Sequence, residues 1–221
     1  MNRALCLLLF LGAAACDYST SVTGNPAPIT NILYLGNSLT IHPPESDVGW
    51  TGNWGMAASA IDKDYVHALA AQWPQATFAV LSLTSFELDY RAFNIASLDS
   101  HLQPPPDLIV VELGDNVVDN SEFGTYYSEL IGHLVANGHS RVLCTSTWFG
   151  SAAIDAANRN ACTRANTTFV DLPGIAADSR NHAESERTFT DAAVGEHPGD
   201  RGMAQIAAAL AAAAATAPSS H

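Results

Sequence analysis

Positive charge is scarce in this sequence. Its 221 residues include nine Lys and Arg against 22 Asp and Glu, which gives a formal net charge of −13. Nucleic acids and anionic membrane surfaces bind proteins through cationic faces, so this balance excludes both as partners of the folded chain. The eight histidines lack the paired spacing of a zinc site, and we therefore predict neither a metal nor any other cofactor.

An N-terminal hydrophobic run long enough to cross a bilayer is also lacking. The apolar run Leu5–Leu11 is too short to span a membrane as a stable helix. It follows Arg3 and precedes small alanines, so we assign residues 1–15 to an export signal. Cys16 directly after it resembles the lipidated cysteine of bacterial lipoproteins. The sequence therefore predicts a lipid-anchored envelope protein facing the periplasm, with ordinary secretion as the alternative.

Two cysteines lie deeper in the chain, Cys144 and Cys162. Exported proteins meet oxidising conditions, so a disulfide between them is one expectation. It would join the end of one predicted strand to the helix that follows. Two separate buried thiols are the alternative, because the sequence does not fix the distance between them.

After a Ser-, Thr-, Gly- and Pro-rich tether over residues 16–29, predicted strands and helices alternate in five βα units. Near-continuous apolar runs, typical of strands covered on both faces, occur at Ile32–Leu35, Phe78–Leu83, Leu108–Leu113, Arg141–Ser146 and Thr168–Asp171. Helices are predicted over Trp54–Ala71, Tyr90–Leu102, Ser121–Asn137, Ala152–Ala165 and Asp200–Ala215. Five units are too few for a barrel. We therefore predict one α/β domain over residues 30–217, a flavodoxin-like three-layer sandwich with a five-stranded parallel sheet.

Three polar residues stand where such a fold places its chemistry. Ser38 lies in the turn after the first predicted strand, at the carboxyl edge where open α/β sheets bind ligands. His197 lies in the loop before the last predicted helix. A serine nucleophile with a histidine base indicates a serine hydrolase. Asn116 follows the third strand and could point its amide at the atom that Ser38 attacks.

Short motifs around these residues resemble blocks of the SGNH hydrolases, also called GDSL esterases and lipases. They are Gly36-Asn37-Ser38-Leu39, Gly114-Asp115-Asn116 and His197-Pro198, in the family's order along the chain. The resemblance implies an SGNH fold with Ser38 as nucleophile and His197 as base. It also implies an oxyanion hole formed by the Ser38 N–H and the Asn116 side chain. Asn37 stands where the family usually has Asp.

The sequence departs from this family at another oxyanion donor. A glycine after the second strand usually donates its N–H there, and the matching position is Glu87. A Glu87 N–H could still donate, although its carboxylate would oppose the developing negative charge. The side chain is expected to point away, to bind a substrate hydroxyl or to form hydrogen bonds within the site. Gly55 is the weaker substitute because it precedes the second strand.

The acid of the expected triad is the second departure. The family usually has Asp three residues before the histidine, where this chain has Val194. Asp191 is the best carboxylate candidate, with Glu196 as another. Some relatives orient the histidine with a backbone carbonyl, and the Val194 carbonyl could do so here. We predict a Ser38–His197 dyad with carbonyl support, with Asp191 as the acid if a triad exists.

Trp54 and Trp148 fall near predicted strand ends or active-site loops, where an aromatic ring could either stack on a sugar or pack within the protein. With no evident lid insertion, we predict an esterase that removes a short acyl group, such as acetyl, from a carbohydrate or small molecule. The expected partner is thus a small-molecule or glycan ester, with membrane contact only through the lipid anchor. The alternative is a non-catalytic ligand- or glycan-binding lipoprotein on a degenerate SGNH fold.

Overall fold

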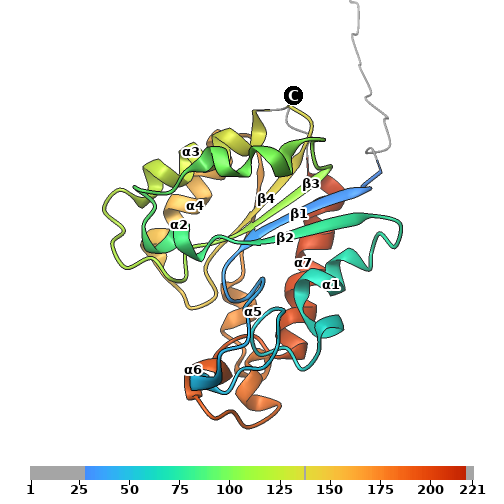
Figure 1. Cartoon of the computed structure of the whole chain (residues 1–221), viewed down its shortest axis with the longest axis vertical. Coiled ribbons are helices and arrows are strands. Elements are labelled where there is room, and N and C mark those ends of the chain that lie inside the picture. The colour runs from blue at the N-terminus through green and yellow to red at the C-terminus, as the bar shows by residue number, and fades with distance from the viewer. Residues whose placement is uncertain (1–27, 137, 218–221) are drawn as a thin grey trace, which may run out of the picture.

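A five-stranded parallel sheet organises the chain. The computed structural model describes residues 28–136 and 138–217, so the predicted signal, Cys16 and nearly all of the tether lie outside the described residues. The strands are β1 (Asn31–Gly36), β2 (Thr77–Ser82), β3 (Leu108–Glu112), β4 (Arg141–Thr145) and β5 (Thr168–Val170). Their spatial order is β2-β1-β3-β4-β5, and every neighbouring pair is parallel (Figure 1). The predicted α/β class and its five parallel strands are confirmed.

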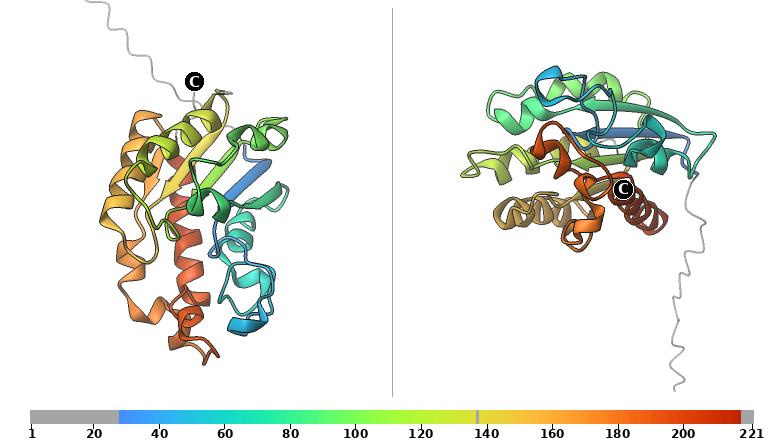
Figure 2. Two further views of the ribbon diagram at one scale, coloured as in Figure 1. Left: turned by 60° about the vertical axis from the view of Figure 1, so that its left-hand side comes forward. Right: turned by 90° about the horizontal axis from the view of Figure 1, so that it is seen from below.

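Helices cover both faces of the sheet and produce three layers (Figure 1, Figure 2). One face packs against α1 (Tyr65–Ala70) and α7 (Asp200–Thr216), and the other against α3 (Phe123–Val135) and α4 (Ala152–Arg164). The connections contain α2 (Thr84–Leu88), α5 (Pro173–Ala176), α6 (Ala192–Gly195) and 3-10 segments at Ser46–Val48, Ile61–Lys63, Ile95–Leu102, Ser179–Asn181 and Ala183–Ser185. Within residues 28–136 and 138–217, no helix combines the length and apolar character needed to cross a bilayer.

Alternate residues of each strand pack into two separate cores. On β1, Ile32 and Tyr34 pack with α1 and α7, whereas Leu33 and Leu35 pack with α3 and α4. Every residue of β3 and β4 is buried. Burial on both faces explains why these strands are near-continuous apolar runs rather than alternating ones. Ile29, the last residue of the predicted tether, is also buried in the first core.

The register of the central strands brings three loops to one edge of the sheet. Gly36, the last residue of β1, pairs with Ser82 of β2 and with Glu112 of β3. Ser38 follows two residues later, between the segments that leave β2 and β3. The carboxyl ends of parallel strands therefore meet around Ser38, as the sequence predicts.

The predicted helix over Trp54–Ala71 is wrong in its first part. Only Tyr65–Ala70 is α-helical, because Asp64 caps it: the Asp64 carboxylate accepts the His67 N–H at 2.7 Å. The same carboxylate accepts the Gly55 N–H at 3.2 Å. These two bonds start α1 at Asp64 and hold the preceding residues in a loop.

The predicted helix over Tyr90–Leu102 is also shorter than expected. The structure has a 3-10 helix at Ile95–Leu102. Just before it, the Asp89 carboxylate accepts the Ala92 N–H at 3.2 Å. Such a local side-chain bond gives the backbone an alternative to the helix, so the segment turns instead.

Cys144 on β4 and Cys162 on α4 are joined by a disulfide, with their Cα atoms 6.5 Å apart. This separation lies in the usual range for such a bond. The disulfide ties β4 to the helix that follows it, which is the first of the two expectations for these cysteines.

Candidate active site

A tight turn after β1 presents Ser38. The N–H groups of Thr40 and Ile41 donate to the Asn37 carbonyl at 3.1 and 3.0 Å. Only glycine fits at Gly36, because a Cβ atom there would lie 1.8 Å from the Thr40 hydroxyl oxygen. Asn37 is fully buried, whereas Ser38 is half-buried. The turn thus buries Asn37 and leaves Ser38 partly exposed at the edge of the sheet.

The loop between α6 and α7 brings His197 to Ser38, although the two are 159 residues apart in the chain. Ser38 Oγ lies 3.1 Å from His197 Nε2. The other ring nitrogen, Nδ1, lies 2.9 Å from the carbonyl oxygen of Ala193. Because a carbonyl only accepts, Nδ1 carries the proton and Nε2 is the acceptor for the Ser38 hydroxyl. This is the tautomer in which a histidine can deprotonate a serine.

Burial controls the basicity of His197. Its side chain is 8% exposed, and this desolvation lowers the pKa of the imidazole below its ordinary value. The charge of His42 lowers the pKa further, whereas the hydrogen bond to Ala193 partly opposes the shift. The ring is therefore neutral near pH 7 and available as a base.

Asp191, the predicted acid of a triad, does not bind the histidine. Its carboxylate accepts the Ala193 N–H at 2.8 Å and caps α6. The Val194 carbonyl, predicted to orient the ring, instead accepts the backbone N–H of His197 at 3.2 Å. The helical turn of α6 aims the carbonyl one residue earlier, that of Ala193, at the ring. The structure brings the Ser38 hydroxyl and the His197 ring together, with a backbone carbonyl rather than a carboxylate at Nδ1.

Asn116 and Glu87 meet beside the turn that carries Ser38. Gly114, with φ of +129°, adopts a conformation suited to glycine and leads the chain from β3 into the turn with Asn116. Asn116 Nδ2 donates to Glu87 Oε2 at 2.7 Å, and Asn37 Nδ2 donates to Glu87 Oε1 at 3.1 Å. The Gly114 N–H also donates to Oε1. The Glu87 carboxylate therefore joins the segments that follow β1, β2 and β3.

The Glu87 N–H, a predicted oxyanion donor, is engaged elsewhere, and the Glu87 side chain forms hydrogen bonds within the site, which is one of the three expectations for it. That N–H donates to the Leu83 carbonyl at 3.3 Å at the start of α2. The Gly55 N–H, the alternative, is taken by Asp64. The other two predicted oxyanion residues, Ser38 and Asn116, lie at the carboxyl edge of the sheet. Each has an N–H group that can donate: the backbone N–H of Ser38 and the side-chain amide of Asn116.

Glu112, the last residue of β3, is a further acid that sequence reasoning missed. It is fully buried and accepts the Thr40 hydroxyl at 3.2 Å and Asn37 Nδ2 at 3.4 Å. Burial raises the pKa of Glu112 well above its ordinary value, and the charges of Asp115 and Glu87 raise it further. Burial and these neighbouring charges therefore favour the protonated form of Glu112. The feature of the sequence that could have identified this acid is a single Glu at the end of an apolar run.

The Asp115 carboxylate holds the loop after β4 by accepting the N–H groups of Trp148 at 3.2 Å and Phe149 at 2.9 Å. Trp148, predicted to stack on substrate, is buried, and its Nε1 donates to the Glu196 carbonyl at 2.9 Å. The Phe149 ring is 46% exposed and meets the His197 ring edge to face, with centroids 5.1 Å apart. Phe149 is thus an exposed aromatic ring beside His197. No signal in the sequence distinguishes the exposed Phe149 from the buried Trp148 next to it.

A cavity of about 470 Å³ adjoins Phe149, with Glu184, Glu196 and His182 among its lining residues. Carboxylates beside an exposed aromatic ring suit a polar ligand that also has apolar faces.

Trp54, the other predicted substrate-binding residue, lies away from this cavity. It is half-buried and packs against Trp50 with ring centroids 5.5 Å apart. Its Nε1 donates to the Ala58 carbonyl at 3.1 Å. The two tryptophans line a cavity of about 310 Å³ together with Arg187.

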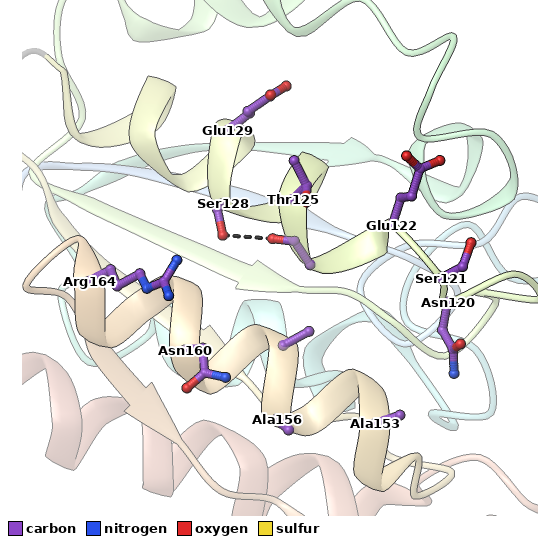
Figure 3. Close-up of a pocket in the computed structure, with 12 residues that line it drawn as sticks. Asn120, Ser121, Glu122, Thr125, Ser128, Glu129, Ala153, Ala156, Asn160 and Arg164 are labelled. Carbon is purple, nitrogen blue, oxygen red and sulfur yellow. Dashed lines mark hydrogen bonds between the residues drawn. The ribbon is translucent and has the colours of Figure 1, made fainter.

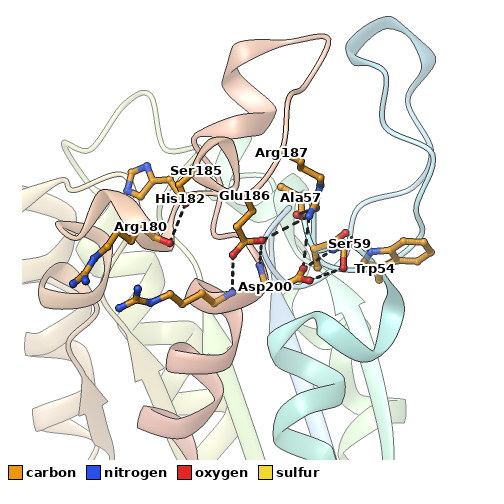
Figure 4. A network of polar contacts seen from close by, with 11 residues as sticks. Trp54, Ala57, Ser59, Arg180, His182, Ser185, Glu186, Arg187 and Asp200 are labelled. Carbon is orange, nitrogen blue, oxygen red and sulfur yellow. Dashed lines mark hydrogen bonds and ion pairs between the residues drawn. The ribbon is translucent and has the colours of Figure 1, made fainter.

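A polar network fixes the loops that carry the dyad (Figure 4). Arg187 donates to the Ala57 carbonyl and lies 3.8 Å from the Asp200 carboxylate. Asp200 accepts the N–H and hydroxyl of Ser59 at 2.7 and 2.6 Å. Glu186 accepts the Asp200 N–H at 2.8 Å. The loop before α1 is thereby tied to the residues on either side of His197.

A groove of about 690 Å³ lies between α3 and α4 (Figure 3). Its lining includes Asn120, Ser128, Asn160 and Arg164, but neither Ser38 nor His197. Across residues 28–136 and 138–217, no three His, Cys, Asp or Glu side chains are arranged to hold a metal ion.

No family model and no curated protein matches the sequence. Among solved structures, a two-domain esterase active on acetylated mannans matches 82% of this chain at 20% identity and a TM-score of 0.55. A family two carbohydrate esterase from Clostridium thermocellum matches 85% at 18% identity and a TM-score of 0.54. The psychrotrophic esterase EstA from Pseudoalteromonas sp. matches 83% at 14% identity and a TM-score of 0.54.

The chain has an SGNH/GDSL hydrolase fold. The fold expected from the three motifs is thereby confirmed. The chain spans 47% of the mannan esterase and 64% of the Clostridium thermocellum enzyme, but 96% of EstA. In this fold β1 and β3 are neighbours, so the turns that carry Ser38 and Asn116 leave the sheet side by side.

Proposed function

We propose that this protein is a serine esterase with a Ser38–His197 catalytic dyad. The observation that carries the proposal is the 3.1 Å approach of Ser38 Oγ to His197 Nε2, with Nδ1 held by the Ala193 carbonyl. Serine is a weak nucleophile without an oriented base, and this geometry supplies one. The esterases that share the fold support the same reaction class.

In the proposed reaction, His197 Nε2 takes the hydroxyl proton of Ser38 while Oγ attacks the ester carbonyl carbon. The Ser38 N–H and an N–H of the Asn116 amide would donate to the resulting oxyanion. His197 then gives its proton to the departing alcohol oxygen, which leaves an acyl group on Ser38. Water, deprotonated by His197, attacks that acyl carbon, and the carboxylic acid departs as Ser38 regains its proton.

We propose a short acyl group, such as acetyl, on a carbohydrate as the substrate. Phe149 and the adjoining cavity, with Glu184 and Glu196, lie on the His197 side of the dyad, where the alcohol half of an ester would leave. Carboxylates accept hydrogen bonds from sugar hydroxyls, and an aromatic face packs on the C–H face of a sugar ring. Two of the matching structures are esterases described with acetylated mannans or with cellohexaose.

We also propose that the protein is exported and lipid-anchored through Cys16. The signal-like residues 1–15 support this, and the Cys144–Cys162 disulfide suits an oxidising compartment. The mass of the N-terminal peptide from bacterial membranes distinguishes an acylated Cys16 from secreted protein that lacks acyl chains.

The test of the esterase proposal joins a substrate series to active-site labelling. The protein is expected to hydrolyse p-nitrophenyl acetate faster than the butyrate and octanoate esters, and to release acetate from acetylated mannooligosaccharides. A fluorophosphonate should label Ser38 and abolish activity in proportion to labelling. Preference for octanoate would indicate a lipase. Absence of both hydrolysis and labelling would support the non-catalytic binding lipoprotein instead.

The acid limb of the pH profile is expected to lie below about pH 6.5, the ordinary pKa of histidine. Neutral His197 is the base, so activity is lost as the pH falls through the pKa of the folded protein. Burial lowers that pKa, which extends activity to lower pH than an exposed histidine would allow. Measuring kcat/KM by acetate release between about pH 4 and 8 locates the limb. A midpoint above about 6.5 would require a carboxylate partner and would contradict the carbonyl-supported dyad.

A further inference from the structure

Glu87 is a carboxyl group in an enclosed place, only 1% exposed. Three N–H donors converge on it: Asn116 Nδ2 at 2.7 Å, Asn37 Nδ2 at 3.1 Å and the Gly114 N–H. An ionised carboxylate only accepts, so three donors match the charged form. Burial raises the pKa of Glu87, while the bonds from Asn116, Gly114 and Asn37 oppose that rise. The donors offset the cost of desolvating the charge.

Asn37 stabilises the buried carboxylate at position 87 by donating a hydrogen bond to it. Its Oδ1 accepts the Leu39 N–H at 3.0 Å, which fixes the orientation of the amide. Its Nδ2 therefore faces Glu87 at 3.1 Å and Glu112 at 3.4 Å. An aspartate at position 37 would accept the same Leu39 bond but would place a third carboxyl group against the other two. The departures from the SGNH motif at Asn37 and Glu87 are thus complementary.

We propose that Glu87 is a positioning residue that fixes the amide of Asn116 for the oxyanion, and that Asn37 is its required partner. The inference rests on the proposed esterase function. The two N–H groups of an amide lie in one plane, so holding one sets the direction of the other. Donors fixed before the reaction stabilise developing charge most effectively. The Glu87 charge meanwhile stays bonded to N–H groups of the protein.

The first test is Glu87→Gln, which keeps the shape and changes one oxygen into a donor. If the Gln side-chain nitrogen replaced Oε1, it would face two other donors, Asn37 Nδ2 and the Gly114 N–H. If it replaced Oε2, it would face only one, Asn116 Nδ2. The Gln side chain is therefore expected to place its nitrogen towards Asn116, which removes the hydrogen bond from Asn116 Nδ2. We expect kcat for p-nitrophenyl acetate to fall about 30-fold with KM within about twofold of the parent value. Glu129→Gln, a change on α3, is the matched control and should leave both constants unchanged.

The second test is the double variant Asn37→Asp with Glu87→Gln. The aspartate introduced at position 37 would attract the Gln nitrogen to the Oε1 position, which returns an oxygen to Asn116. The double variant is therefore expected to recover at least about fivefold in kcat over Glu87→Gln. A residue that only supports the fold would not show this rescue, because the double variant still leaves the Gly114 N–H without its acceptor.

The outcomes separate this proposal from the esterase proposal. A kcat of Glu87→Gln within about twofold of the parent, no rescue in the double variant, or failure of both variants to fold would overturn the positioning role. If the parent protein itself hydrolyses no ester and takes no fluorophosphonate, the esterase proposal fails. The NMR signal of the Asn116 side-chain amide then decides: a shift in Glu87→Gln supports the contact, and an unchanged signal overturns it.

Discussion

Replacing Ser38 by alanine is expected to lower kcat for p-nitrophenyl acetate by at least about 10⁴-fold. The change removes the nucleophile, so only the oxyanion donors and substrate binding remain to accelerate the reaction. Ser38 Oγ is hydrogen-bonded to His197 at the edge of the sheet, and the turn itself is held by Asn37 and Thr40. The fold should therefore persist, with the midpoint of thermal unfolding within about 2 °C of the parent.

Ser100→Ala is the matched control for this measurement. Ser100 is exposed in the 3-10 segment Ile95–Leu102, away from the site, and its loss should change neither kcat nor the thermal midpoint. A Ser38→Ala protein that keeps more than about a tenth of the parent activity would show that another group attacks the ester.

Replacing His197 by alanine is expected to lower kcat/KM by about 10³-fold, because general-base catalysis by a positioned histidine contributes on that order. Asp191→Asn is the informative comparison. An asparagine side chain can still cap α6 at the Ala193 N–H, and the Nδ1–H of His197 still donates to the Ala193 carbonyl. Activity of Asp191→Asn should therefore remain within about twofold of the parent.

The contrast between these two variants distinguishes a dyad from a triad. A loss of about 10²-fold or more in Asp191→Asn would mean that the carboxylate reaches His197 during the reaction and stabilises the imidazolium. Equal, small losses in both variants would remove His197 from the role of base.

The layered fold could be predicted because its signals are local and strong. Strands buried on both faces, such as β3 and β4, are near-continuous apolar runs with polar residues only at their ends. The helix before β2 was predicted too long because its start depends on Asp64 reaching both Gly55 and His67. Apolar periodicity carries no information on such side-chain bonds.

The parts of the site that escaped prediction depend on orientation rather than on residue type. Ser38 and His197 follow from their places beside a strand and a helix. The carbonyl that holds the ring belongs to Ala193, not Val194, because the turn of α6 sets which carbonyl faces His197. For Glu87, counting residues finds the position, but whether the backbone or the side chain faces the site depends on how α2 is placed.

The 159-residue separation of Ser38 and His197 has a consequence for how the protein acquires activity. The loop that carries His197 leads directly into α7, which packs on the sheet and against α1 only when the last part of the chain docks. A partly folded chain can already contain β1 and its turn, yet its serine has no base. Under the proposed mechanism, Ser38 therefore has its base only when this loop and α7 are in place, and a chain in which they are not docked is expected to hydrolyse no ester.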